Sequence, residues 1–368
     1  MKEKKVWALL LTLAMVFALA ACTPAAQDPS AAPTDPAAGT SQAPSAQPSQ
    51  APGTQQPSQE PSQPAGERET VRLAVLSGPT GVGAAKLISD DEAGTTVNDY
   101  EWTIAADNNE LTVGLSSADP TFDIATVASN LAVNLYNKTE GGVKIIALGT
   151  QGVLHILEGG GTENIQSVAD LAGKTVYATG QGANPEFILR YLLEQNGLTP
   201  GEDVELVFAE PAEITQGLKS GTIEAAMLPV PAATAAIIQG EGQIRQAIDV
   251  THAWDEMKSG SQLIMTAVVA RTEFIEEHPE AVAAFLEEYE ASINYVNNNP
   301  EEISQTIADL GITPSAPIAQ QAIPQCHLVY IDGADMVGAI SDYFQVLYSI
   351  DPASVGGSLP DDAIYYVP

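Results

Sequence analysis

Residues 71–83 read VRLAVLSGPTGVG, a β-branched apolar run followed at once by a glycine-bearing loop. The run from Val71 to Leu76 predicts a buried strand, and the loop from Ser77 to Gly83 predicts a turn into a helix that begins near Gly81. A strand, a tight turn and a helix make up half of a βαβ unit. The segment therefore predicts an α/β fold with a mainly parallel sheet.

The same alternation continues along the chain. Further strands are predicted at 102–106, 122–128 and 143–148, with helices that begin near Asn108 and Asn130. A second series has predicted strands at 175–178, 204–208, 223–228 and 244–250 and predicted helices at 184–196, 212–219 and 232–239. We therefore expect two α/β units whose sheets are covered by helices on both faces. The stretch 263–270 is expected to be a strand that returns the chain to the first unit.

The C-terminal third is expected to be more helical. Its clearest signal is an apolar stripe at three- and four-residue steps, with Pro279 in the first turn. The stripe consists of Val282, Phe285, Leu286, Tyr289, Ile293 and Val296. We interpret it as a helix face that packs against the core.

The N-terminus has the pattern of a secretion signal. Lysines precede an apolar run from Val6 to Leu19, which is too short to span a bilayer. The run ends in Leu19-Ala20-Ala21-Cys22, a lipobox in which the Cys22 thiol receives a diacylglyceryl group before cleavage. We therefore predict a signal peptide at 1–21 and lipidation of Cys22; an ordinary core thiol is the alternative for this cysteine.

The following stretch is rich in Pro, Ser, Ala and Gln and cannot form a core. We predict that 22–69 is the lipidated cysteine and a disordered tether that holds the folded part away from the membrane. The folded part is long enough for two lobes. We expect lobe 1 to comprise 70–150 and 264–368, and lobe 2 to comprise 151–263.

Charge and cysteine content exclude several classes of function. Removing three lysines and one glutamate with residues 1–21 leaves 11 basic and 46 acidic residues, a net charge of −35. Such a chain is not expected to bind nucleic acid. The remaining cysteine is Cys326, so an intramolecular disulfide is not expected, and the histidines show no metal-ligand spacing.

Three polar loops follow predicted strands, at the sheet edge where parallel α/β proteins bind ligands. They contain Gly78 to Gly81, Ser129-Asn130, and Gly182 to Asn184. The first loop has the glycine spacing of a P-loop but lacks the Gly-Lys-Ser/Thr that nucleotide hydrolysis requires, so a tight turn or a ligand loop remains. Asn184 followed by Pro185 is also typical of a helix cap.

At this point the sequence resembles the type II periplasmic binding proteins of ABC importers, in the branch that binds nitrate, sulfonates, taurine and thiamine pyrimidines. The resemblance extends from Val71 to Pro368. It rests on LSGPTG (76–81), DIATVASNLA (123–132), DLAGKTV (170–176), MLPVP (227–231) and SVGGSLP (354–360). The DLAGKTV element is shared by many type II proteins and indicates the fold more than the ligand.

The resemblance implies two α/β lobes joined by two crossing strands, near Thr150–Val153 and Ile264–Val269, with a ligand cleft between the lobes. It places ligand contacts at Gly78, Pro79, Thr80, Gly81, Ser129, Asn130, Gly182, Ala183, Asn184 and Pro229. It implies no catalytic residue, no metal and no cofactor. No Arg or Lys lies in these loops, but helix N-termini can bind oxyanions without a basic side chain, so a small anionic solute is an open alternative.

The resemblance implies an extracytoplasmic solute-binding lipoprotein, anchored to the outer face of a Gram-positive-type membrane by lipid alone. It is expected to be a monomer that delivers a nitrate-, sulfonate-, taurine- or pyrimidine-like small molecule to an ABC permease and its ATPase. An enzyme resembling the thiamine-pyrimidine synthases is one alternative, although their cysteine-rich iron motif is missing here. A ligand sensor without transport is another.

Two residues lead to further expectations. If backbone N–H groups of Gly78 to Gly81 bind the solute, Gly81→Val should weaken binding strongly and change stability only modestly. Trp254 could stack on a ring of the solute, but a packing role is the simpler interpretation.

Overall fold

The computed structural model describes residues 68–257 and 260–368, which belong to one compact unit, Ser62–Pro368. The predicted signal peptide, Cys22 and nearly all of the predicted tether lie outside the described residues. Among the described residues, no helix combines the length and apolarity that a bilayer span requires.

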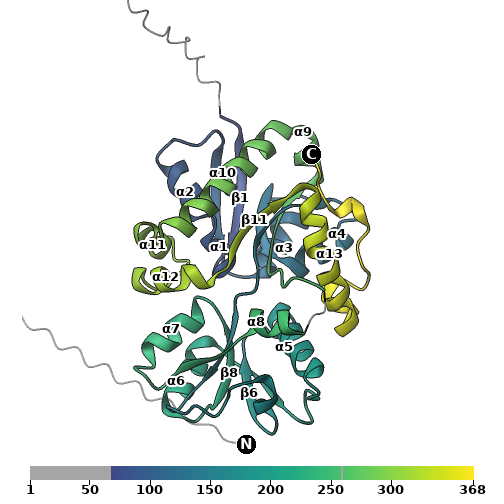
Figure 1. Ribbon diagram of the computed structural model, residues 1–368. Helices are drawn as coiled ribbons and strands as arrows, with labels where there is room; N and C mark the ends of the chain where they lie inside the picture. The colour runs from purple at the N-terminus through teal and green to yellow at the C-terminus, as the bar shows by residue number, and fades with distance from the viewer. Residues whose placement is uncertain (1–67, 258–259) are drawn as a thin grey trace, which may run out of the picture. The chain divides into compact units, whose positions relative to one another are not determined.

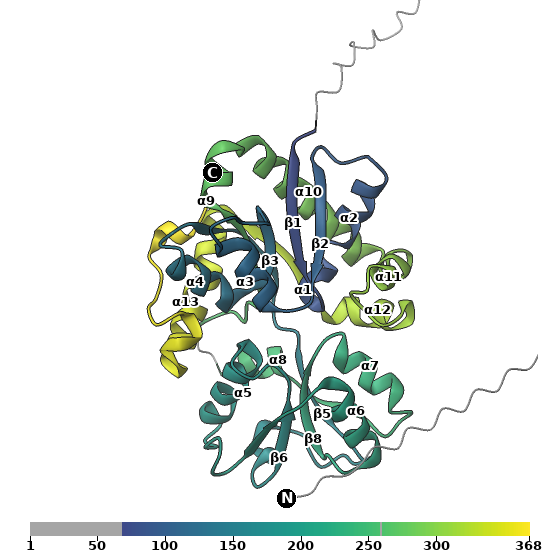
Figure 2. The same cartoon turned by 180° about the vertical axis from the view of Figure 1, so that it is seen from behind.

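The first sheet has six strands in the order β11-β4-β10-β3-β1-β2 (Figures 1 and 2). They are β1 (Thr70–Leu76), β2 (Asp99–Ala105), β3 (Ile124–Ala128), β4 (Val143–Thr150), β10 (Thr266–Arg271) and β11 (Leu328–Asp332). Strand β1 pairs in parallel with β2 and β3, whereas β10 runs antiparallel between β3 and β4 and β11 is antiparallel to β4. We call this sheet with its helices the first lobe.

The second sheet has five strands in the order β7-β6-β8-β5-β9. They are β5 (Leu154–Glu158), β6 (Thr175–Ala178), β7 (Glu205–Phe208), β8 (Ala225–Pro229) and β9 (Arg245–Asp249). Strand β6 is parallel to β7 and β8, while β5 is antiparallel to β8 and β9. In each sheet, therefore, the strand through which the chain arrives from the other sheet lies antiparallel in the interior. We call this sheet with its helices the second lobe.

Helices cover both faces of both sheets, as the sequence predicted. In the first lobe they are α1 (Pro79–Val82), α2 (Ala85–Glu92), α3 (Asn108–Ser116), α4 (Ser129–Lys138), α9 (Thr272–Glu277), α10 (Pro279–Asn298), α11 (Pro300–Asp309), α12 (Ala316–Ala322) and α13 (Gly333–Ile350). In the second lobe they are α5 (Asn184–Gln195), α6 (Pro211–Ser220), α7 (Ala232–Gln239) and α8 (Val250–Glu256). Short 3-10 turns occupy Val168–Leu171, Ile323–Gln325, Pro352–Val355 and Asp362–Ile364.

The apolar residues of these helices explain the layers. One cluster joins α3, α4 and α13 to one face of the first sheet, and a second joins α2, α10, α11 and α12 to the other face. The predicted stripe of α10 is buried throughout, with no member more than 7% exposed. In the second lobe α5 covers one face, and α6 and α7 cover the other.

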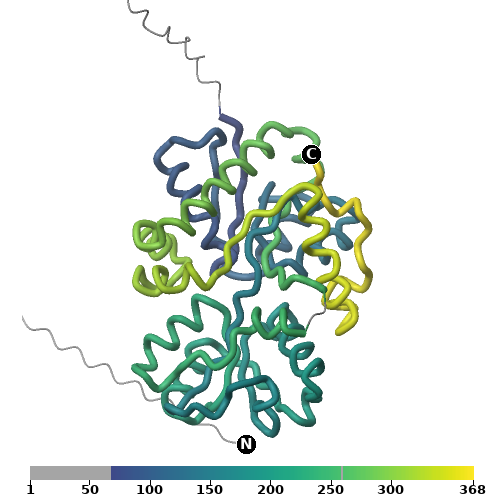
Figure 3. The backbone as a smooth tube through the Cα atoms, in the orientation of Figure 1, coloured from purple at the N-terminus to yellow at the C-terminus, as the bar shows by residue number. Residues whose placement is uncertain are grey.

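The predicted strands and helices are confirmed, but the expectation of mainly parallel sheets needs a correction. Strands β5 and β11 were not predicted, and they and β10 run antiparallel to their neighbours. The first crossing is the irregular link Gln151–Val153 (Figure 3). The second precedes Thr266, because Ile264–Val269 falls largely within β10, in the interior of the first sheet.

The two crossings are bonded to each other. The Gln151 side chain donates to Gln262 Oε1 at 3.2 Å, and the Met265 N–H donates to the Thr150 carbonyl at 3.0 Å. The Gln151 N–H also donates to the carbonyl of His327, immediately before β11, at 3.1 Å. The two crossings and the residue before β11 are thus held together by hydrogen bonds.

Glu158, at the end of β5, is a buried carboxylate that ties the loop after β5 to β9. It accepts hydrogen bonds from Thr162 Oγ1 and the Asn164 N–H, both at 2.7 Å, and forms an ion pair with Arg245. Burial alone would raise the pKa of Glu158, but these hydrogen bonds, with one from the Ile165 N–H, hold it below the ordinary glutamate value.

We expect Glu158→Gln to lower the free energy of unfolding at pH 7 by about 1–3 kcal/mol, because a buried network loses its charged acceptor. A lowered pKa contributes stability that is fully present above the ordinary glutamate pKa and is lost as the pH falls through the lowered value. The wild type and the variant should therefore converge in acid. Urea denaturation between pH 7 and pH 3 measures this, with the exposed Glu194→Gln as control, and a constant difference across that range would contradict it.

Candidate functional site

Polar residues that follow strands of the two sheets lie in the first turns of helices α1, α4 and α5 (Figure 1). Thr80 lies in α1, Ser129 and Asn130 begin α4, and Asn184 begins α5 of the second lobe. All four are buried, with at most 7% of their surface exposed. Since parallel strands end at one sheet edge, the fold itself collects these side chains.

Ser129 is the centre of this group. Its N–H donates to the Met265 carbonyl at 3.0 Å, and its hydroxyl donates to the Ile264 carbonyl at 2.6 Å. Its oxygen accepts a hydrogen bond of 3.0 Å from Asn184 Nδ2. One serine therefore connects α4 to the second crossing and to the other lobe.

The Asn184 side chain does not cap its own helix. The N-cap of α5 is Ala183, and Asn184 is the first helical residue, with its amide directed to Ser129. The alternative that capping alone explains the Asn184-Pro185 pair is therefore wrong for the asparagine side chain.

Three threonine hydroxyls extend the group towards α1. Thr150 Oγ1 and Thr266 Oγ1 are 2.6 Å apart, and Thr266 Oγ1 lies 3.3 Å from Thr80 Oγ1. Thr150 ends β4 and Thr266 begins β10, and both are buried. Sequence reasoning missed these two, although each is a polar residue at the end of an apolar strand.

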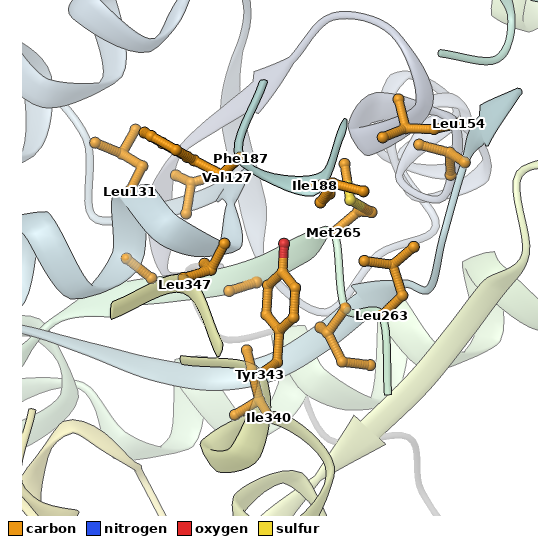
Figure 4. Packing of buried hydrophobic residues seen from close by; sticks show 14 of the residues in the cluster. Val127, Leu131, Leu154, Phe187, Ile188, Leu263, Met265, Ile340, Tyr343 and Leu347 are labelled. Atoms are coloured by element: carbon orange, nitrogen blue, oxygen red, sulfur yellow. The ribbon is translucent and has the colours of Figure 1, made fainter. Parts of the chain in front are cut away.

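Tyr343 of α13 completes the group. Its ring stands among apolar side chains, and its hydroxyl is directed away from Ile340 and towards α5 (Figure 4). Burial raises the pKa of Tyr343. Its hydroxyl has no hydrogen-bond partner among the described residues.

We call these residues the bridging cluster. It consists of Thr80, Ser129, Asn130, Thr150, Asn184, Thr266 and Tyr343. Apart from the tyrosine phenol it contains only hydroxyl and amide groups, and no Lys or Arg of the described chain is buried. The cluster can thus exchange neutral hydrogen bonds with a small molecule, and it has no basic side chain of its own for an anion.

The remaining predicted contacts lie differently. The Gly81 N–H donates to Gly78, the Ala183 N–H donates to Gly180, and the Gly182 N–H donates to Glu186 Oε2 at 2.8 Å. These backbone groups already have protein partners, and Gly182 itself is exposed. Pro229 and Pro79 are half-buried; Pro229 ends β8 opposite Leu154, and Pro79 has no N–H to offer.

Trp254 packs in the core, as the simpler interpretation had it. The indole is fully buried, and its Nε1 donates to the Ser261 carbonyl at 3.0 Å. Its ring lies 5.0 Å from the ring of Tyr191 and 5.8 Å from that of Tyr343. Trp254 therefore supports the tyrosine of the bridging cluster from the second lobe.

Comparison with known proteins decides which fold this is. A solved ABC transporter structure from Parabacteroides distasonis superimposes with a TM-score of 0.67 over 81% of this chain and 98% of that chain, at 22% identity. The chain has the fold of the type II periplasmic binding proteins. The resemblance predicted from the sequence is thereby confirmed at the level of fold.

Other type II structures agree. The periplasmic aliphatic sulphonate binding protein of Escherichia coli has a TM-score of 0.65 at 16% identity, over 82% of this chain and 92% of that chain. The periplasmic nitrate-binding protein of Synechocystis PCC 6803 has a TM-score of 0.50 at 17% identity, over 73% of this chain and 75% of that chain. At such identities the likeness establishes the fold only.

Sequence comparison matches only part of this chain. The family model described as NMT1/THI5 like matches residues 127–303. A protein of Brucella abortus (strain 2308), described only as a binding protein, is 25% identical over 168 residues, which is 46% of this chain and 50% of that protein. The chain thus spans about half the length of the curated relatives that it matches.

The surroundings of Gly81 argue against the expectation that Gly81→Val would change stability only modestly. A Cβ at this buried glycine would lie 2.7 Å from the Leu76 carbonyl oxygen and 3.0 Å from Val75 Cγ1, both in the same lobe. The new side chain would therefore press on β1 of its own lobe.

We expect Gly81→Val to lower the free energy of unfolding by at least about 1–3 kcal/mol, as overpacking of a core does. Gly338→Ala is the matched control, because it adds a methyl group to an exposed helical glycine with open space around it and should be neutral or slightly stabilising. Thermal melting of both variants measures this, and wild-type stability of Gly81→Val would contradict it.

Proposed function

We propose that the protein is an extracytoplasmic solute-binding lipoprotein of an ABC importer, which captures a small molecule between its lobes and delivers it to a permease. The observation that carries the proposal is the bridging cluster, in which Asn184 of one lobe donates to Ser129 of the other. A buried hydrogen bond between lobes can form on closure and break on opening. It thereby couples solute capture to lobe movement.

The comparisons support the same class of function. The structures from Escherichia coli and Synechocystis are titled as sulphonate- and nitrate-binding proteins, and that from Parabacteroides distasonis as an ABC transporter. By analogy, we propose a small solute of the wider nitrate, sulfonate, taurine and pyrimidine class, and an ABC permease with its ATPase as partners. We propose a monomer as the working form.

Binding is favoured over catalysis by the chemistry of the described chain. Cys326 is fully buried, and burial raises its pKa to about 12, which disfavours the thiolate needed by a nucleophile or an iron ligand. The matching family model is described as NMT1/THI5 like, and that family includes enzymes. The alternative to a binding protein is therefore an enzyme that resembles the thiamine-pyrimidine synthases. Reversible binding without turnover separates the two.

A screen by thermal shift tests the binding proposal. Nitrate, sulfonates, taurine, bicarbonate, pyrimidines and amines are offered to the purified full chain, and a true solute at 100 times its Kd should add about 2.7 kcal/mol of stability. Calorimetry should then give one solute per chain, and mass spectrometry should recover it unchanged. Conversion of the solute to a product would contradict the binding proposal and show that the protein is an enzyme.

The N-terminal segment leads to a separate prediction. We propose that 1–21 is cleaved and that lipid on Cys22 holds the protein at the outer face of the cell membrane, with two acyl chains supplying stable attachment. Cys22→Ala should release or mislocalise the protein while its melting temperature stays that of the wild type.

Cell fractionation at high salt measures this release, and Cys326→Ala is the control that keeps the lipobox. Unlipidated protein that is cleaved free of its signal and still sediments with membranes would contradict the anchor.

A further inference from the structure

The bridging cluster contains two buried oxygen atoms whose chemical identity can be fixed. They are Oδ1 of Asn130 and Oδ1 of Asn184, and neither has a hydrogen-bond partner among the described residues. Asn130 is 6% exposed and Asn184 is 1% exposed. A buried acceptor without a donor destabilises the protein, so each oxygen favours a molecule that supplies one.

The amide of Asn184 can take only one orientation. Ser129 has a single hydroxyl proton, and this proton is donated to the Ile264 carbonyl at 2.6 Å. The Ser129 oxygen can therefore only accept from Asn184, so the NH₂ group must face it. The remaining atom of the amide is the carbonyl oxygen.

The amide of Asn130 is fixed in the same way. Its Nδ2 donates at 3.3 Å to the carbonyl of Ser354, which also accepts from Asn134 Nδ2 at 3.2 Å. A carbonyl cannot donate, and a flipped amide would set oxygen against oxygen. Asn130 is the next residue after Ser129 in α4, and Asn184 donates to the Ser129 oxygen, so one acceptor lies on a chain neighbour of Ser129 and the other on its hydrogen-bond partner.

Two of the groups that could attract an anion are already engaged. The first N–H of α4, that of Ser129, donates to Met265. The N-terminus of α5 holds the carboxylate of Glu186, which accepts from the Gly182 N–H at 2.8 Å and pairs with Arg190. Glu186 is 9% exposed, so a nearly buried negative charge occupies the place where a helix dipole favours an anion.

From this arrangement we infer that the solute presents N–H donors to Asn130 and Asn184 and carries no anionic group, as an amine, an amide or an amidine does. The inference rests on the proposed function and narrows it. It separates this chain from the structural neighbours titled as sulphonate- and nitrate-binding proteins. The Tyr343 hydroxyl adds a donor or acceptor for the same solute.

Matched probes test the inference on the full chain in detergent. The sets are benzoate, benzamide and benzamidinium, and methanesulfonate and methanesulfonamide. In each set that binds, we expect the donor-bearing member to raise the melting temperature more and to have a Kd at least tenfold lower than the anion. Tighter binding of any anion than of its matched donor overturns the inference but leaves solute capture standing. If no probe binds, both the inference and the proposed capture fail.

Two variants place the effect at the cluster. Asn184→Ala should raise the Kd of a donor-bearing probe about fivefold to tenfold, since one hydrogen bond is lost. Asn196→Ala, at the far end of α5, should leave that Kd unchanged. Glu186→Gln should strengthen anion binding relative to the wild type by removing the resident charge, and the exposed Glu194→Gln should not. Equal affinities in Asn184→Ala and Asn196→Ala, or no gain in Glu186→Gln, would exclude this assignment of the acceptors.

Discussion

The hydrogen bonds of Ser129 fix three separate segments of the chain at one point. The residue stands at the first turn of α4, and its N–H and hydroxyl both donate to the chain that arrives from the second lobe, at Met265 and Ile264. Its remaining acceptor capacity takes the amide of Asn184. The three hydrogen bonds of this one residue therefore fix the positions of α4, the second crossing and α5 relative to one another. Both donors of Ser129, its N–H and its hydroxyl, are used.

Most of the fold could be predicted because its strands are local apolar runs. The run from Val71 to Leu76 and the glycine loop behind it are sufficient to predict β1 and the turn into the first helix. The antiparallel strands could not be predicted. β5 follows β4 after a link of only three residues and includes the polar residues His155 and Glu158, and nothing in its local sequence specifies its partners. Its direction is set by the path of the chain between lobes, a property of the whole fold.

The candidate site divides in the same way. Thr80, Ser129, Asn130 and Asn184 were expected at a sheet edge because polar residues follow buried strands there. Among them Ser129 and Asn184 are hydrogen-bonded, and Thr80 reaches Thr150 through Thr266. Tyr343 was missed because its helix carries an apolar stripe in which a tyrosine is typical of core packing. The sequence also did not predict that the loop N–H groups have protein partners. Gly182 donates to the Glu186 side chain, and Gly81 and Ala183 donate to backbone carbonyls of their own loops.

The interior position of the arriving strands has a consequence for how the protein folds. All strands of the second lobe lie in one continuous stretch, from Leu154 to Asp249, so that lobe can complete its sheet from contiguous chain. The first sheet remains split until β10 inserts between β3 and β4, pairing Thr266 with Ala128 across the whole intervening lobe. Such long-range closure is slow because loop entropy is lost before the contacts form. The second lobe is therefore the natural early-folding unit, and the edges of β3 and β4 are the surfaces most in need of protection from aggregation until the last third of the chain is available.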